Sequence, residues 1–343
     1  MEASMGRKAI FWAGAGIGVV LAGRALLRKR RAYDLAGKVV LITGGSRGLG
    51  LVMAREFASR GARLALCARD AEELDRARED LETRGAEAFT VPCDVTDRAL
   101  VERMVEAVRA HYGRIDVLVN NAGIITVGPM ETMTVSDFEE AMQVHFWASV
   151  YTALAIAPEM QQRREGRIVT IASIGGKISV PHLLPYDASK FAQVGFSEGL
   201  RAELAKDGVL VTTVCPGLMR TGSHVQARFK SRHKLEATLF SLLDTSPLTS
   251  ISAESAARRI VDACVYGDPE LVLSFPAQAA ATFHALFPGV TADLLGLANR
   301  ALPGPGGIGS RSASGQESET AITASPLMAP IQKAAAANNE AGA

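Results

Sequence analysis

Residues 38–57 constrain the fold more strongly than any other part of the chain. Residues 39–42 are a short run of valine, leucine and isoleucine, which is typical of a strand buried on both faces in a parallel sheet. A glycine-rich turn follows at residues 43–50, and a helical pattern continues to Phe57. In this order the glycines allow close approach of a pyrophosphate, and the helix N-terminus supplies free N–H groups and a positive dipole. The segment therefore predicts a dinucleotide site that includes Thr43, Gly44, Ser46, Arg47, Gly48, Leu49 and Gly50.

Apolar runs and helical patterns then alternate along the chain. Further strands are expected at residues 64–67, 88–91, 115–119, 167–172, 210–215 and 270–273. Helices are expected at residues 71–84, 98–112, 136–162, 186–206 and 252–266, the third of them broken near Pro158. This alternation predicts an α/β fold of the Rossmann type, a doubly wound parallel sheet of about seven strands with helices on both faces. A ligand is then expected beyond the carboxyl ends of the strands.

Polar residues and glycines follow most of these strands. Any one of them is also consistent with an ordinary turn or helix cap. Because the carboxyl ends of parallel strands meet at one edge of the sheet, we expect these residues to converge on one cleft. The residues assigned to the cofactor on this ground are Arg69, Asp94, Val95, Asn120, Ala122, Gly123, Pro216, Gly217 and Thr221, and Ser173 follows the fifth strand.

Tyr186 and Lys190 are four residues apart in a helical pattern, so their side chains share one helical face. A tyrosine has an unperturbed pKa of about 10, and a fixed positive charge nearby lowers this pKa. The pair is therefore a candidate for proton transfer to or from a substrate oxygen near neutral pH. Taken alone, the same spacing is more often an ordinary surface pair.

Together these motifs resemble the short-chain dehydrogenase/reductase family over about residues 37–273. The resemblance rests on the turn at 43–50, residues 120–123, Ser173, the Tyr186-x-x-x-Lys190 pair and Pro216-Gly217. It implies a Rossmann-type domain that moves hydride between a nicotinamide cofactor and an alcohol or carbonyl. It further implies that Tyr186 donates and accepts the proton and that Ser173 holds the substrate oxygen. By the same resemblance Lys190 lowers the tyrosine pKa and, like Tyr186, contacts the cofactor, at its nicotinamide ribose.

His145 departs from the family pattern, in which an asparagine stands at the corresponding place in the long helix. That asparagine belongs to a hydrogen-bond chain that leads from the lysine through water to solvent. A neutral imidazole can also donate with one nitrogen and accept with the other, so His145 is a fourth candidate catalytic residue. Lys190 disfavours a second positive charge, so we expect His145 to be neutral at pH 7 and activity to fall as it is protonated. A packed core histidine is the alternative.

The end of the second strand indicates which dinucleotide is bound. NAD-specific sites place an acidic residue there, which bonds the ribose hydroxyls and repels a 2′-phosphate. Here the strand ends in Ala68 and Arg69, and Arg47 lies in the glycine-rich turn. Two guanidinium groups suit a phosphate dianion, so we expect NADP(H). The acidic residue that does follow, Asp70, is also consistent with a helix N-cap.

Composition excludes several other classes of function. A net charge of +1 gives no reason to expect nucleic-acid binding. The four cysteines, Cys67, Cys93, Cys215 and Cys264, are scattered singly, which indicates reduced core thiols rather than a disulfide framework. The six histidines form no ligand pattern, so no metal site is expected.

Residues 1–34 differ from the rest of the chain. Residues 9–27 are apolar except for Arg24, and a basic cluster follows at 28–31. About 20 apolar residues span a bilayer, so we expect a membrane anchor at 9–27 with a basic linker. The basic cluster favours a cytoplasmic location for the main domain. A cleaved signal peptide is the rival interpretation, but the positive charge is heavier after the apolar run than before it.

The second half of the chain ends in three further segments. Residues 218–252 mix basic and apolar residues where the family has a substrate lid; this stretch either covers an apolar pocket, lies on a membrane or packs on its own domain. The catalytic domain is expected to cover residues 35–275. Residues 276–302 contain two short apolar helical stretches, and 303–343 are rich in proline, glycine, serine and alanine, which predicts a disordered tail.

The leading hypothesis from the sequence is a membrane-anchored, NADP(H)-dependent oxidoreductase that acts on a carbonyl or alcohol. The anchor and the apolar lid favour a lipid-like substrate, and the family resemblance favours a homodimer. The alternative is a non-catalytic dinucleotide-binding or scaffold protein, which His145 in place of the family asparagine would fit.

Overall fold

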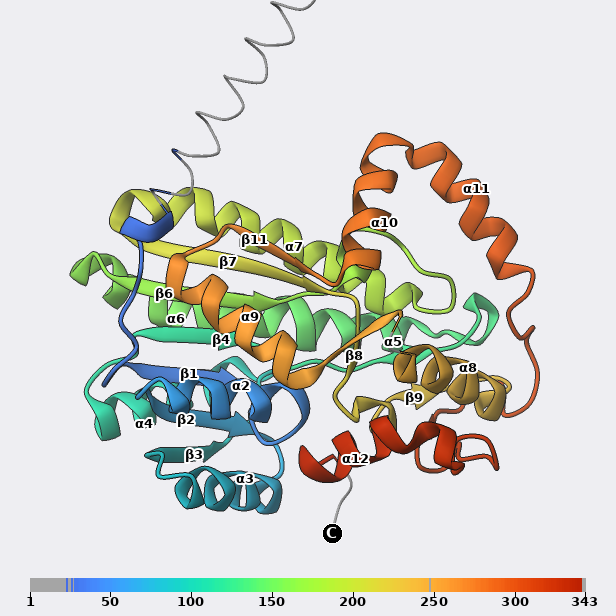
Figure 1. Ribbon diagram of the computed structural model, residues 1–343, viewed down its shortest axis with the longest axis horizontal. Coiled ribbons are helices and arrows are strands. Elements are labelled where there is room, and N and C mark those ends of the chain that lie inside the picture. Colours follow the sequence, from blue (N-terminus) through green and yellow to red (C-terminus); the bar gives the residue numbers. More distant parts are fainter. Residues whose placement is uncertain (1–22, 24–25, 27, 247, 341–343) are drawn as a thin grey trace, which may run out of the picture.

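A seven-stranded parallel sheet forms the centre of the computed structural model, which describes residues 23, 26, 28–246 and 248–340 (Figure 1). The strands follow the order β11-β7-β6-β4-β1-β2-β3, and every neighbouring pair is parallel. The predicted doubly wound sheet is therefore confirmed. The sheet strands are β1 (Val39–Thr43), β2 (Arg63–Ala68), β3 (Ala88–Pro92), β4 (Val117–Asn120), β6 (Gly166–Ile171), β7 (Val209–Pro216) and β11 (Glu270–Leu273).

Helices bury both faces of this sheet because successive side chains of a strand point to opposite sides. Val40 and Ile42 of β1 pack with α2 (Gly48–Ser59), α3 (Ala71–Thr83) and α9 (Ala253–Tyr266). Val39 and Leu41 pack with α4 (Arg98–Tyr112), α6 (Ala148–Arg163) and the C-terminal end of α7 (Leu184–Leu204). The apolar character of residues 39–42 in β1 thus follows from its central place between two helical layers.

The long helix expected at 136–162 is continuous through Pro158 but irregular elsewhere. It consists of α5 (Val135–Ala141), a π-helical segment η2 (Met142–Trp147) and α6, which contains Pro158. The predicted break near Pro158 is therefore wrong. A proline removes a hydrogen bond to the carbonyl four residues earlier. Here that residue, Leu154, is 66% exposed, so the missing bond lies on the solvent-facing side of the helix. The irregularity lies instead around His145, consistent with the tendency of π-bulges to occur at functional sites.

The basic linker before β1 is docked on the domain. Arg28 makes a bidentate ion pair with Asp268, at 2.8 and 2.9 Å. Arg167 donates to the Arg31 carbonyl oxygen at 2.8 Å and stacks over the ring of Tyr33. Of the predicted anchor at 9–27, only positions 23 and 26 belong to the described residues, and the rest lies outside them. Among the described residues, no helix has both the length and the apolar character needed to cross a membrane.

The region after β7 folds over the carboxyl edge of the sheet. It contains β8 (Leu218–Arg220), η5 (Ser223–Val225), β9 (Arg228–Phe229), α8 (His233–Thr245) and β10 (Ser250–Ser252). β10 pairs with β8, and β9 pairs with β5 (Thr126–Val127). After β11, α10 (Phe275–Leu286) and α11 (Pro288–Asn299) form a hairpin that projects from the body of the molecule (Figure 1). Two short helices were expected in this region.

The C-terminal tail is folded, so the prediction of disorder over residues 303–343 is wrong for the described part, which extends to residue 340. It contains β12 (Ala313–Ser314), η6 (Pro326–Met328) and α12 (Ala329–Ala337). β12 pairs antiparallel with β9, and Met328 and Ile331 are almost fully buried. The composition of the tail gave a wrong prediction because this segment folds onto the domain with few large apolar residues. Backbone pairing holds β12, and small alanines let α12 approach closely, with Ala335 directly against Gly222.

Candidate active site

A cavity of about 1230 Å³ opens beyond the carboxyl ends of the strands, where the sequence predicts the ligand. Of the residues predicted from the sequence, those that line it are Gly44, Ser46, Arg47, Gly48, Leu49, Gly50, Arg69, Asp94, Val95, Ala122, Gly123, His145, Ser173, Tyr186, Lys190, Pro216, Gly217 and Thr221. Thr43 and Asn120 do not line it. Both are buried, and the Asn120 side chain accepts a hydrogen bond from Thr152 at 2.7 Å.

The glycine-rich turn is bonded to the end of β4. The Thr43 hydroxyl oxygen accepts hydrogen bonds from the N–H groups of Asn121 and Ala122, at 3.0 and 3.1 Å. The Asn121 side chain donates to the carbonyl oxygens of Thr43 and Gly44, at 3.0 and 2.9 Å. Asn121 belongs to the motif at residues 120–123, but it was not among the residues assigned to the cofactor from the sequence. Its role depends on the pairing of β1 and β4, which the local pattern does not reveal.

Two glycines of the turn are required by its geometry. Gly44 has φ of +63°, a conformation that L-residues with a Cβ rarely adopt. A Cβ on Gly50 would overlap the Gly44 carbonyl oxygen and would lie 2.7 Å from the Asn121 side-chain nitrogen. The turn thus brings backbone close to backbone at the start of α2, as a phosphate cradle requires. These features fit a bound dinucleotide.

Charged residues surround the outer end of the turn. Arg47 is the N-cap residue of α2 and forms ion pairs with Glu73 and, at 3.4 Å, with Glu340. The Ser46 hydroxyl group donates to Glu73 at 2.9 Å. Arg69 is exposed on the rim and makes no ion pair with another described residue. Asp70 is the N-cap of α3 and accepts from the Glu73 N–H, so the capping interpretation of Asp70 is confirmed.

Tyr186, Ser173 and Lys190 meet where β6 and α7 approach the cavity. The Lys190 ammonium group lies 5.6 Å from the centre of the Tyr186 ring and donates to the Ile171 carbonyl oxygen and the Gln193 side chain, both at 2.9 Å. Ser173 caps η3 (Ile174–Gly176) by accepting from the Gly175 N–H at 3.0 Å. The three candidate catalytic side chains therefore face one cavity.

Burial dominates the protonation of the tyrosine and lysine. It raises the pKa of Tyr186 to about 12, although the interaction with Ser173 opposes this rise. Burial also lowers the pKa of Lys190 to about 7. The lowered tyrosine pKa expected from the sequence is thus absent in this structure. The physical reason is that removal from water disfavours the phenolate and the ammonium ion alike, and the ammonium group bonds to Ile171 and Gln193.

His145 is fully buried, and both of its ring nitrogens have partners. Nε2 accepts the Ile124 N–H at 3.1 Å, so the proton lies on Nδ1, 2.7 Å from the Ser189 hydroxyl oxygen. That hydroxyl donates to the Tyr186 carbonyl oxygen at 2.7 Å. Burial, and then Lys190, hold the pKa of His145 well below its usual value, as the expectation of a neutral imidazole requires. No direct bond to Lys190 is present, so the relay stays a hypothesis.

Three acidic or basic residues that the sequence gave no reason to select also line the cavity. The His182 Nδ1 lies 2.8 Å from a carboxylate oxygen of Glu236 on α8, and both side chains are almost buried. Asp244 lies about two turns further along α8. It is 4% exposed, and burial raises its pKa to about 8. α8 also presents Leu239, Phe240 and Leu243 to the cavity, so it covers the pocket as a lid would.

Comparison with known proteins decides the family. The family model described as short chain dehydrogenase matches residues 38–231, more than half of the chain. The chain belongs to the short-chain dehydrogenase family.

A relative in Anopheles gambiae, a dehydrogenase/reductase SDR family protein 7-like, is 35% identical over 270 residues, which are 77% of this chain and 84% of the relative. Estradiol 17-beta-dehydrogenase 11 of Macaca fascicularis is 35% identical over 196 residues, 56% of this chain and 65% of the relative. The crystal structure of L-sorbose reductase from Gluconobacter frateurii, in complex with NADPH and L-sorbose, matches with a TM-score of 0.63 and 29% identity. This match covers 71% of this chain and 97% of that chain. As a member of this family, the chain is of the dehydrogenase/reductase kind and binds a nicotinamide cofactor.

Gly50→Ala should weaken binding of the nicotinamide cofactor at least about tenfold, the equivalent of one lost hydrogen bond to a charged group. The added Cβ must displace the Gly44 carbonyl or the Asn121 side chain, which hold the turn. Fluorescence titration with NADPH and NADH measures the effect. Gly195→Ala is the matched control, because open space surrounds that position on α7. Unchanged binding by the Gly50 variant would contradict this account of the turn.

His145 should remain neutral from about pH 6 to pH 8, because its pKa lies well below the usual ~6.5. Its ring signals in an NMR titration, assigned by their loss in His145→Asn, should not shift over this range. If protonation of His145 lowered activity, as the sequence analysis expects, His145→Asn would flatten the acid limb of the pH profile. Because the imidazole stays neutral over this range, any acid limb near pH 6.5 should instead persist in His145→Asn. An acid limb that disappears in the variant would restore the relay hypothesis.

Proposed function

We propose that this protein is an NADP(H)-dependent oxidoreductase that transfers hydride between the nicotinamide and a lipophilic carbonyl or alcohol, with Tyr186 as general acid/base. One observation carries the proposal: Ser173, Tyr186 and Lys190 line the same cavity as the glycine-rich turn. Proton transfer and dinucleotide binding are then adjacent, as this chemistry requires.

The cofactor, when bound, supplies or accepts the hydride. The glycine-rich turn would hold its pyrophosphate with N–H groups at the start of α2, and Lys190 and Tyr186 would hold the nicotinamide ribose, as the family resemblance implies. Ser173 donates a hydrogen bond to the substrate oxygen, which gains negative charge during carbonyl reduction. With a pKa raised to about 12, Tyr186 carries its proton at neutral pH and is set to donate it to that oxygen.

Two arginines support a preference for NADP(H). The end of β2 has no acidic side chain at Ala68, and Arg69 on the rim has no ion-pair partner among the described residues. Arg47 is already paired with Glu73, so its charge is partly compensated. Arg69 therefore contributes most of the attraction for a 2′-phosphate.

The walls of the cavity suggest a largely apolar substrate with one polar group. Leu239, Phe240 and Leu243 of α8 face the cavity, as do Leu295 on α11 and Leu302 just after it. The buried His182–Glu236 pair lies on the same wall, and a substrate hydroxyl group can form a hydrogen bond with it. The name of the relative from Macaca fascicularis, an estradiol dehydrogenase, supports a lipophilic substrate class.

A membrane anchor at residues 9–27, with the catalytic domain in the cytoplasm, remains part of the proposal on the strength of the apolar sequence alone. The exposed apolar side chains of α10 and α11, among them Phe275, Leu286 and Leu297, fit a protein that works at a membrane surface. A homodimer is proposed from the family resemblance.

Tyr186→Phe should lower the turnover number by about 10²–10⁴, because it removes the proton of the general acid. Binding of NADPH should change little. The assay is NADPH oxidation with carbonyls of graded chain length, and Tyr151→Phe, which alters a tyrosine stacked on Trp147, is the matched control. Near-normal turnover in the Tyr186 variant would exclude the assigned role.

Arg69→Ala should weaken NADPH binding about tenfold and leave NADH binding nearly unchanged, given ~1.5–3 kcal/mol per hydrogen bond to a charged group and partial screening at an exposed site. Arg98→Ala, an exposed arginine at the start of α4, is the control. Calorimetric titration with the two cofactors measures the difference. Equal weakening of both cofactors would show that Arg69 does not read the 2′-phosphate.

A further inference from the structure

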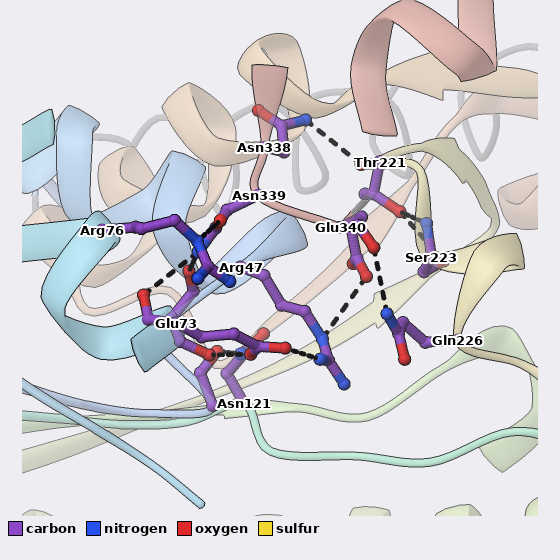
Figure 2. A network of polar contacts seen from close by, with 12 residues as sticks. Arg47, Glu73, Arg76, Asn121, Thr221, Ser223, Gln226, Asn338, Asn339 and Glu340 are labelled. Atoms are coloured by element: carbon purple, nitrogen blue, oxygen red, sulfur yellow. Dashed lines mark hydrogen bonds and ion pairs between the residues drawn. The ribbon is translucent and has the colours of Figure 1, made fainter. Parts of the chain in front are cut away.

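The last described residues of the tail, Asn338, Asn339 and Glu340, lie across the glycine-rich turn (Figure 2). We call residues 338–340 the tail tip. It enters the cavity that holds the candidate cofactor site, because Glu340 is one of the lining residues. A segment almost three hundred residues distant in sequence thus meets the part of the site predicted to bind the pyrophosphate.

Two residues of the tail tip form hydrogen bonds with backbone groups of the turn. The Gly48 N–H, at the N-terminus of α2, donates to the Asn338 carbonyl oxygen at 2.8 Å. The Asn339 side chain donates to the carbonyl oxygens of Ser46 and Glu73, at 2.9 and 3.1 Å. Arg76 donates to the Asn339 side-chain oxygen at 2.9 Å. The N–H group that would bind a phosphate oxygen is therefore used by the tail.

Glu340 places its carboxyl group beside the same turn. Its side chain contacts the position that a Cβ on Gly48 would take, and it lies 3.4 Å from the Arg47 guanidinium group. It is 4% exposed, and its Oε2 atom has no hydrogen-bond partner among the described residues. An acceptor group at a helix N-terminus, next to an arginine, stands where a phosphate of the dinucleotide is expected.

The tail tip also bonds the opposite wall of the cleft, so it bridges the opening. The Asn338 side chain donates to the Thr221 carbonyl oxygen at 3.2 Å, and Gln226 donates to the Glu340 carbonyl oxygen at 3.0 Å. Arg55 on α2 donates to the Asn338 side chain at 3.0 Å. The tail tip therefore bonds to both walls of the cleft at once. A dinucleotide bound in the cleft would occupy the space that the tail tip fills.

We propose that the tail tip is an autoinhibitory segment that occupies the phosphate subsite and must leave before the dinucleotide binds. The inference rests on the proposed function, because it assumes that the turn binds a dinucleotide phosphate. The apparent affinity for the cofactor is reduced by the fraction of molecules in which the tail tip is docked. Release of the tail then raises cofactor affinity without any change in the catalytic residues.

The protonation of Glu340 makes docking depend on pH. Burial, reinforced by Glu73, raises its pKa to about 7, against the opposing effect of Arg47. These are the charged groups that face it; Gln226, on the other wall, is neutral. Because the docked pKa lies above the ordinary ~4.5, docking is strongest at low pH and weakens as pH rises through about 7. Cofactor affinity should therefore increase over this range.

Asn339→Ala tests the proposal directly, since it removes two donated hydrogen bonds and one accepted bond and leaves every lining residue of the cavity in place. The dissociation constant for NADPH should fall about five- to thirtyfold, as expected for the loss of one or two net hydrogen bonds. Asn299→Ala, an exposed asparagine at the end of α11, should leave it unchanged. Unchanged or weaker binding by the Asn339 variant overturns the proposal.

Glu340→Gln tests the pH dependence, because glutamine resembles the neutral carboxyl group and keeps the tail docked. In the unaltered chain the NADPH dissociation constant should fall between about pH 5.5 and 8. In the variant this dependence should be lost and binding should remain weak at pH 8. Tight binding by the variant at pH 8 would contradict the assigned role of Glu340.

Hydrogen exchange separates failure of this inference from failure of the proposed function. In the cofactor-free protein the amides of α12 and the Gly48 amide should be protected, whether or not the protein is an oxidoreductase. Addition of NADPH should increase exchange in α12 while the turn stays protected. Protection of α12 by NADPH would mean that the tail covers a bound cofactor, and would overturn the proposal alone. If neither NADPH nor NADH binds the Asn339 variant, the proposed function fails, and autoinhibition fails with it.

Discussion

The hydrogen bonds between the ends of β1 and β4 hold the functional edge of the sheet together. Thr43 accepts from two N–H groups after β4, and Asn121 donates to two carbonyl groups of the glycine-rich turn. They continue the pairing of the two strands to the point where the chain leaves the sheet. Since Thr43 is buried, a missing partner would leave an unsatisfied group at a cost of about 1–3 kcal/mol. The start of α2, and with it the phosphate cradle, depends on this junction.

A second constraint is the burial of polar side chains beside Tyr186. Lys190 bonds to Gln193, which donates to the Ser149 hydroxyl group, and that hydroxyl donates to the His145 carbonyl oxygen. This network satisfies polar groups that burial would otherwise leave unpaired. Burial also opposes charge, and it raises the pKa of Tyr186 and lowers that of Lys190. The interior thus keeps the reacting groups near neutrality while it holds them in position.

The tail connects the same edge of the sheet to the end of the chain. α12 packs on the region after β7, and this places Asn338 and Glu340 between the glycine-rich turn and Thr221. Only a few hydrogen bonds and one ion pair join the tip to the turn. Such contacts can be exchanged for those of a charged ligand without unfolding the sheet, because the tail contributes nothing to the seven-stranded core. Ligand access and tail docking therefore depend on the same small set of groups.

The sequence by itself determined the parallel sheet and its alternation with helices, and most of the site residues that it assigned do line the cavity, because each strand and each turn carries a local pattern of apolar residues and glycines. It did not determine the protonation of Tyr186, since burial by neighbouring elements outweighs the charge of Lys190. Nor did it reveal the bonds of Asn121 to the glycine-rich turn or the folded tail. Their partners are far away in sequence, and only the tertiary structure brings such groups within hydrogen-bond distance, where desolvation and pairing decide their role.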